Sequence, residues 1–169
     1  MLEQTLIILK PDTLQRGIAG EVLTRFERAG LKIVGAKMLQ PDKDHYFHHY
    51  ETIGQMISRR GQKAFDVTLN MMQEGPVLAM VLEGVEAVAT VRKLVGTTEP
   101  KAALPGTIRG DYAHMSFGHA DEKQSGIPNM IHASGDVEEA KKEIAHWFKP
   151  EELYNYAAAH EKHTQLSDK

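Results

Sequence analysis

The residue best placed to do chemistry is His132, which lies in a short apolar run, residues 130–133, ahead of a helical pattern. Ser134 or Asp136 could cap that helix, and a helix N-terminus favours the negative charge of a phosphoryl group. A neutral imidazole is a nucleophile near neutral pH, and the phosphoramidate that it forms passes the group on readily. His132 is therefore a candidate phosphohistidine, although a hydrogen-bonded structural histidine is the more common case in a chain with nine histidines.

Side chains that suit phosphate oxygens stand near the ends of several predicted elements. They are Lys10, Arg92, Thr98 and Arg109. Arginine can hold phosphate oxygens through two parallel hydrogen bonds, and lysine supplies a point charge. Taken singly, each of these polar side chains fits an ordinary solvated surface position. The chain lacks both the G-x-x-x-x-G-K-[ST] and the G-x-G-x-x-G patterns, so the common phosphate loops are excluded.

The other histidines form only incomplete candidate metal sites. His45, His48 and His49 have the i, i+3, i+4 spacing that places two imidazoles on one helix face. The surrounding segment offers no clear third ligand. A weaker cation site could be formed by His114, His119, Asp111 and Asp121. We therefore predict no metal site held by the protein alone.

Composition limits the protein class. A length of 169 residues favours one domain, with enough burial for a core. The absence of cysteine excludes disulfides and a thiol nucleophile. A net charge of -3 gives no basic field for nucleic acid. With no targeting pattern and no long apolar segment, we expect a cytoplasmic protein with neither a membrane nor a nucleic-acid partner.

Hydrophobic periodicity predicts helices between strands. Strands are expected at residues 5–9, 31–39, 77–82 and 130–133, and helices at 18–29, 42–70 (interrupted near Gly61), 86–95 and 137–148. Residues 102–128 are expected to be mostly loop, and the tail from about residue 150 onward to be partly frayed. This order indicates a single α/β (α+β) domain, for which the ferredoxin-like βαββαβ sandwich is one solution.

Several motifs together resemble nucleoside diphosphate kinases. They are Thr5-Leu-Ile-Ile-Leu-Lys-Pro-Asp12, Gln15-Arg16-Gly17, Gly75-Pro76, Pro105-Gly-Thr-Ile-Arg-Gly-Asp111, Asn129-Met-Ile-His-Ala-Ser134, and Glu143-Ile144 leading to Trp147-Phe148. They follow the order of the family and span nearly the whole chain.

The resemblance implies a ferredoxin-like domain with an antiparallel sheet covered by helices. It implies a homo-oligomer, a hexamer in preference to a tetramer, and ping-pong transfer of a phosphoryl group between nucleoside triphosphates and diphosphates. His132 would be the phosphorylated nucleophile, Glu143 would orient its ring, and Ser134 would support Glu143. The phosphates would be held by Lys10, Tyr50, Arg92, Thr98 and Arg109, while Asn129 with Lys10 would contact the ribose. Mg²⁺ would enter on the nucleotide phosphates.

This sequence departs from the family pattern at several positions. Ala133 and Gly135 replace the usual glycine and aspartate around the serine, and Pro128 stands where many members have arginine. The family stacks a phenylalanine on the base, and here Phe65 is the expected counterpart, with the position of Ala64 as the alternative. The stretch from residue 50 to 75 and the loop from 111 to 129 are longer than usual.

Two other functions compete with the enzyme. One is a binding or scaffold protein on the same fold that has lost activity, and the survival of His132, Lys10 and Glu143 argues against it. The other is an RNA-binding ferredoxin-like sheet, which the net charge and the lack of a basic, aromatic-rich strand argue against.

Overall fold

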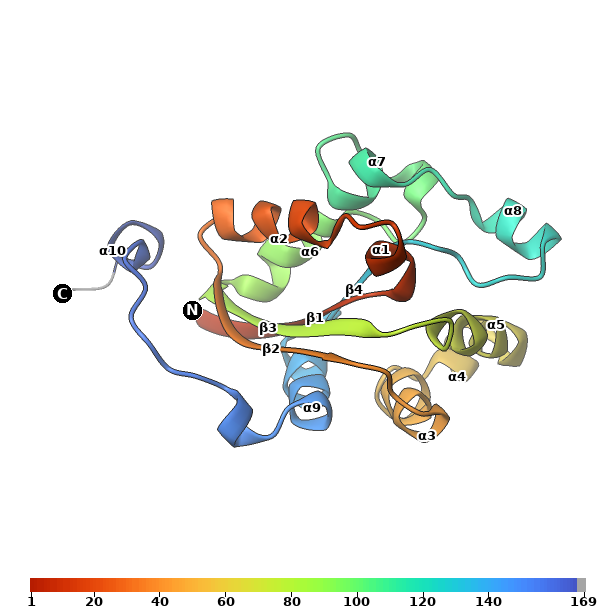
Figure 1. Ribbon diagram of the computed structural model, residues 1–169, viewed down its shortest axis with the longest axis horizontal. Helices are drawn as coiled ribbons and strands as arrows, with labels where there is room; N and C mark the ends of the chain where they lie inside the picture. Colours follow the sequence, from red (N-terminus) through yellow and green to blue (C-terminus); the bar gives the residue numbers. More distant parts are fainter. Residues whose placement is uncertain (167–169) are drawn as a thin grey trace.

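The computed structural model describes residues 1–166, and a four-stranded antiparallel sheet lies at its centre (Figure 1). The strands are β1 (Leu2–Leu9), β2 (Lys32–Leu39), β3 (Val77–Val85) and β4 (Ile131–Ala133). Their order across the sheet is β2-β3-β1-β4, so β1 pairs with both β3 and β4. In this register Ile8 lies opposite both Ala79 and His132. The predicted antiparallel, ferredoxin-like sheet is confirmed.

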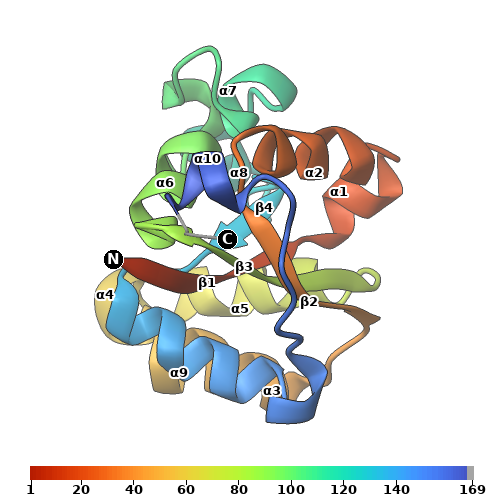
Figure 2. The same ribbon diagram turned by 90° about the vertical axis from the view of Figure 1, so that its left-hand side faces the viewer.

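Helices cover both faces of the sheet (Figures 1 and 2). On one face lie α1 (Pro11–Gln15), α2 (Ala19–Arg28), α6 (Ala87–Val95) and α7 (Ile108–Tyr112). On the other lie α3 (Lys43–Phe47), the π-helix η1 (His48–Ile53), α4 (Met56–Arg60), α5 (Gln62–Met72) and α9 (Val137–Trp147). Shorter elements are η2 (Pro100–Ala102), α8 (Phe117–Glu122), η3 (Pro150–Glu152) and α10 (Glu161–Thr164).

The continuous apolar run of β1 results from burial on both faces of the sheet. Ile7 and Leu9 join a cluster with residues of α2 and α6, including Phe26. Leu6 and Ile8, which point to the opposite face, join a second cluster with residues of α5 and α9. Successive strand side chains alternate between faces, so an uninterrupted hydrophobic strand needs two helical layers. The site is built at the end of this buried strand.

Two stretches differ from the sequence predictions. The segment expected to be mostly loop contains α7 and α8, each started by a side-chain cap: Thr107 accepts from Gly110 N, and Ser116 accepts from His119 N. Each helix is too short to show a helical repeat. The region between β2 and β3 is interrupted at Gly61 as predicted, and also at Gln55, whose φ is 50°.

The described part of the C-terminal tail is attached to the edge of the sheet. Tyr154 N donates to Val34 O at 2.7 Å, and Tyr156 Oη donates to Ile33 O at 2.7 Å. The tail from about residue 150 onward is expected from the sequence to be partly frayed. Residues 167–169 lie outside the described part, and both this expectation and the single-domain assignment stay predictions. None of the described helices is long and apolar enough to cross a membrane.

Candidate active site

A cavity of about 550 Å³ lies where the C-terminal end of β1 meets β4, η1, α5 and α9. Lys10 comes from the end of β1, His132 from β4, and Glu143 from α9. Tyr50 of η1 and Thr68 of α5 line the facing wall. The volume is in the range of small-ligand sites, which are typically about 300–1,000 Å³. Residues from opposite ends of the chain therefore share one cavity.

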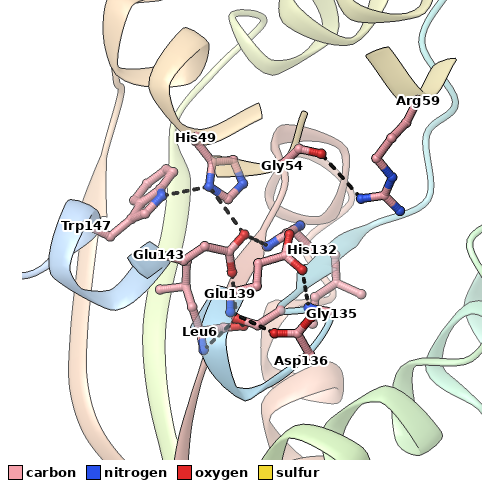
Figure 3. Close-up of polar contacts among 12 residues, drawn as sticks. Leu6, His49, Gly54, Arg59, His132, Gly135, Asp136, Glu139, Glu143 and Trp147 are labelled. Atoms are coloured by element: carbon pink, nitrogen blue, oxygen red, sulfur yellow. Dashed lines mark hydrogen bonds and ion pairs between the residues drawn. The ribbon is translucent and has the colours of Figure 1, made fainter. Parts of the chain in front are cut away.

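His132 is held by a buried carboxylate (Figure 3). Its Nε2 lies 2.8 Å from Glu143 Oε1. Glu143 is 1 % exposed, whereas the His132 side chain is 19 % exposed and borders the cavity. No hydrogen bond from Nδ1 is found among the described residues. A carboxylate accepts hydrogen bonds only, so it places the ring proton on Nε2 and leaves the lone pair on Nδ1.

Glu143 is itself positioned by Ser134 and by the start of α9. Ser134 Oγ donates to Glu143 Oε2 at 2.6 Å, and Leu6 N donates to Ser134 Oγ at 3.2 Å. Of the two predicted caps, Asp136 begins α9, because its Oδ1 accepts from Glu139 N at 2.8 Å. The orienting chain thus runs from the central strand β1 through Ser134 and Glu143 to His132.

The backbone just before β4 adopts an unusual conformation. Met130 has a φ of 73°, although it is not glycine. Its carbonyl accepts from Lys10 N at 2.9 Å and from Thr13 Oγ1 at 2.6 Å, and its amide donates to Asp12 Oδ2 at 3.0 Å. A left-handed non-glycine residue costs about 1–3 kcal/mol and persists only where its surroundings fix it. These three hydrogen bonds fix the turn that presents His132 beside Lys10.

Lys10 is buried at the base of the cavity, where Pro11 stops the strand and starts α1. Its Nζ donates to Asn129 Oδ1 at 2.7 Å, and Asn129 Nδ2 donates to Thr98 O at 2.9 Å. Burial, followed by the positive charge of Arg109, lowers the pKa of Lys10 to about 8. A buried amine of this kind gains from a nearby anion.

Arg109 joins the end of α6 to the segment that leads into β4. Its Nε donates to Asn129 O at 3.0 Å, its Nη1 to Gly96 O at 3.0 Å, and its Nη2 to Ile131 O. The residue is 8 % exposed, and burial, followed by the charge of Arg92, lowers its pKa to about 10. Arginine has five N–H donors, so two remain for a ligand after these three bonds.

The remaining residues predicted to bind phosphate also line the cavity. Arg92 is exposed on α6, and Thr98 lies in the following loop. Tyr50 Oη is buried, and the structure gives it no hydrogen-bond partner among the described residues. Burial raises the pKa of Tyr50 strongly, so the hydroxyl stays protonated and can donate.

Phe65, the expected base-stacking ring, does not line the cavity. It is buried at 4 % exposure in α5 and contacts Phe47 edge to face, with ring centroids 5.7 Å apart. Ala64, the alternative position, is absent from the lining as well. The physical reason is that Phe65 lies about one turn before Thr68 in α5, where its ring packs against Phe47 of α3, whereas Thr68 reaches the cavity.

Sequence reasoning missed Met56, Arg59 and Arg60, which come from α4 and line the cavity. Arg59 Nη1 donates to Gly54 O at 3.3 Å (Figure 3). Arg60 lies over the Phe117 ring, 5.7 Å from its centroid. The only signal in the sequence was an adjacent arginine pair in the lengthened stretch, and no spacing rule assigns such a pair to a site.

His49 was also missed, because its spacing with His45 and His48 suggested a shared helix face. Instead, His45 and His48 contact His146 on α9, with ring centroids 3.9 and 4.4 Å apart, respectively, while His49 contacts His132, with ring centroids 4.6 Å apart. The irregular π-helix turns His49 inward, where it is 1 % exposed.

Ligand-type atoms of His49, His132 and Glu143 lie within 4.8 Å of one another, as in a metal site. However, the atoms are already engaged in hydrogen bonds, and Lys10 and Arg92 share the same cavity. Positive charges at short range oppose a bare cation and favour an anion. The arrangement therefore suits a phosphate beside a nucleophilic imidazole.

Comparisons with known proteins agree with this geometry. The family model described as nucleoside diphosphate kinase matches residues 3–153. The nucleoside diphosphate kinase of Borreliella burgdorferi is 45% identical over 156 residues, which cover 92% of this chain and 93% of that protein. That of Pyrococcus furiosus is 46% identical over 158 residues, covering 94% and 90%. The chain belongs to the nucleoside diphosphate kinase family.

A solved structure of the nucleoside diphosphate kinase from Borrelia burgdorferi is described as a transition-state mimic with bound vanadate and ADP. It matches this chain with a TM-score of 0.95 at 43% identity and covers 98% of both chains. The predicted resemblance is confirmed. Because so little of either chain is left unmatched, the lengthened segments here belong to a form of the nucleoside diphosphate kinase fold that another member shares.

Proposed function

We propose that the protein is a nucleoside diphosphate kinase that transfers the γ-phosphoryl group of a nucleoside triphosphate to a nucleoside diphosphate through a phosphohistidine on His132. The observation that carries the proposal is the hydrogen-bonded chain from Ser134 through Glu143 to His132, which ends in a cavity lined by cations. Family membership supports the same reaction.

In the first half-reaction, the lone pair of His132 Nδ1 attacks the γ-phosphorus. The N–P bond forms as the bond to the β,γ-bridging oxygen breaks, and the diphosphate leaves with that electron pair. Positive charge develops on the imidazole, and Glu143 stabilises it through the proton on Nε2. The second half-reaction reverses these steps with a different diphosphate, which gives ping-pong kinetics.

The cations of the cavity hold the transferred group and its neighbours. Lys10, Arg92 and the two unused N–H groups of Arg109 would contact phosphate oxygens, and the hydroxyls of Tyr50 and Thr98 would donate to them. Mg²⁺ would enter bound to the nucleotide phosphates and neutralise part of their charge. Catalysis would then rest on positioning and electrostatic stabilisation.

The nucleoside would lie toward α4 and α5. Asn129, together with Lys10, would contact the ribose. Met56, Met71 and Ile127 give this cavity an apolar side, and thioether and aliphatic side chains contact any base without reading its edge. Phe65 is therefore not part of the proposed base site.

The assembly and location stay predictions from the sequence: a homo-oligomer, with a hexamer in preference to a tetramer, in the cytoplasm. Sedimentation of the purified protein measures the oligomer number directly.

The reaction is tested by incubating the protein with γ-labelled ATP and then adding unlabelled GDP. We expect label on the protein that is lost in acid but stable in base, and that moves to GTP when GDP is added. His132→Gln keeps an N–H group for Glu143 but lacks the nucleophile, so it should remain folded and unlabelled. His119→Asn, at an exposed histidine, should be labelled like the wild type. Labelling of the His132 variant would refute the mechanism.

A further inference from the structure

Trp147 and His49 form a buried pair directly behind the proposed nucleophile (Figure 3). Trp147 Nε1 donates to His49 Nδ1 at 3.2 Å. The same His49 nitrogen lies 3.6 Å from Glu143 Oε1, the atom that accepts from His132. His49 and Trp147 are 1 % and 2 % exposed, so water does not mediate these contacts.

The indole N–H decides which nitrogen of His49 carries its proton. Indole is a donor only, and a neutral imidazole has one donor and one acceptor nitrogen. Because Trp147 donates to Nδ1, that nitrogen must be unprotonated and the proton must be on Nε2. In Figure 3 the Nε2 atom lies on the side of the ring opposite Trp147, and the structure gives it no hydrogen-bond partner among the described residues.

The Nδ1–H tautomer of His49 would weaken the hydrogen bond between Glu143 and His132. A proton on His49 Nδ1 would point at Glu143 Oε1, and a small shift would close the 3.6 Å gap to a hydrogen bond. Glu143 would then divide its charge between two imidazoles, and its hold on His132 would weaken. Without Trp147, this arrangement would be favoured, because it gives a buried N–H group an acceptor.

We propose that Trp147 is a positioning residue for phosphoryl transfer: its indole N–H holds His49 as the Nε2–H tautomer, and this reserves Glu143 Oε1 for His132. The inference rests on the proposed function of His132. It explains why a polar pair occupies a fully buried position where two apolar side chains would pack without an unsatisfied donor.

The surroundings keep His49 neutral as well as in one tautomer. Burial is the largest influence and lowers its pKa well below the ordinary value, and the charges of His132, His146, His45 and Lys10 act in the same direction. Glu143 is the anion that faces it. Protonation of Nδ1 would also require the loss of the hydrogen bond from Trp147.

The first test uses the wild-type protein. Imidazole ¹⁵N chemical shifts distinguish the two tautomers, and we expect the His49 resonances of an Nε2–H ring at neutral pH. An Nδ1–H ring or an imidazolium would overturn the inference, whatever the outcome of the labelling experiment on His132.

The second test uses two variants and single-turnover phosphorylation of His132. Trp147→Phe keeps a ring but removes the donor, so His49 should take the Nδ1–H form in its ¹⁵N spectrum, and the rate should fall about 10-fold, the scale of one charge-assisted hydrogen bond. The double variant Trp147→Phe/His49→Leu removes both polar groups, and its rate should return close to that of wild type.

A purely structural role for Trp147 predicts that the double variant is phosphorylated more slowly than Trp147→Phe, because it has lost more of the buried packing. A double variant no faster than Trp147→Phe would therefore refute the inference, provided that both variants melt cooperatively. If the wild-type protein is not labelled on His132 at all, it is the proposed function that fails, and the tautomer measurement still stands.

Discussion

The two walls of the cavity differ in how their residues are held. The motif wall consists of Lys10, Asn129, His132 and Glu143, with Ser134 buried behind Glu143, and each is joined to another by a hydrogen bond of 2.6–2.8 Å. The helical wall consists of residues 48–72, which form three helical elements interrupted at Gly54–Gln55 and at Gly61. Its arginines make one long hydrogen bond to a carbonyl and one contact with a ring.

This difference indicates that the two walls have different roles. The motif wall holds reacting groups whose geometry must not vary, and it is anchored to β1 and α9. The helical wall contributes charge and apolar surface from the lengthened stretch, where side chains have fewer fixed partners. Changes in the motif wall should therefore lower turnover, whereas changes at Met56 or the arginines of the helical wall should alter nucleotide binding, and changes at its buried Phe65 should alter stability.

The largest effect is expected for Glu143→Gln, which preserves the shape of the side chain but removes its charge. The imidazole would lose the anion that stabilises its developing positive charge, and the amide could present the wrong donor to His132. We expect kcat to fall by about 100-fold or more, with the nucleotide KM little changed. A kcat within a few fold of wild type would show that the motif wall tolerates loss of its central charge.

Arg109 and Arg92 allow the same comparison between two cations of the cavity, one buried and hydrogen-bonded and the other exposed. Arg109→Lys cannot replace three hydrogen bonds to backbone carbonyls, so we expect a loss of unfolding free energy of roughly 3–5 kcal/mol as well as of activity. Arg92→Lys, at an exposed position, should lower turnover and leave the melting temperature unchanged, because an ammonium lacks the planar fork. Equal melting temperatures for the two variants would contradict the claim that Arg109, unlike Arg92, stabilises the fold.

In the helical wall, Phe65→Ala is expected to act on stability alone. Removing a buried ring that packs on Phe47 should cost about 3–5 kcal/mol, while the KM for a purine or pyrimidine diphosphate should stay unchanged. Met56→Ala is the matched variant on the cavity side, where KM should rise with little change in melting temperature. Chemical denaturation and steady-state kinetics on both variants separate the two roles, and a raised KM for Phe65→Ala would restore it to the base site.

The sequence predicted every residue of the motif wall but, among the cavity-lining residues of the helical wall, only Tyr50, for a physical reason. His132, Ser134 and Glu143 lie near one another along the chain, at the end of a strand and on the helix that follows it, so strand and helix geometry brings them together. Arg60 and His49 reach the cavity only because a π-helix and a left-handed Gln55 redirect the chain. Phe65, expected in the cavity, lies outside it, against Phe47, because the place where α5 begins depends on those irregular turns.

The effect that is smallest near neutral pH concerns the titration of Lys10 in the motif wall. Its pKa in the folded protein is lowered from 10.5 to about 8, chiefly by burial, so the amine of the free enzyme loses its charge as the pH rises through about 8. The value of kcat/KM, which reports the free enzyme, should therefore fall by about 10-fold for each unit above that pH.

The free energy of unfolding should instead increase as the pH rises. Between pH 8 and 10.5 the unfolded chain retains a proton that the folded protein has released, so Lys10 alone makes the folded state more stable as the pH rises. Lys10→Arg keeps its charge throughout this range and should lose the alkaline limb of kcat/KM. Lys37→Arg, at a partly exposed lysine paired with Glu152, should keep it. A limb that persists in Lys10→Arg would assign the titration to another group, and the buried amine would then not be the cation that the phosphates require.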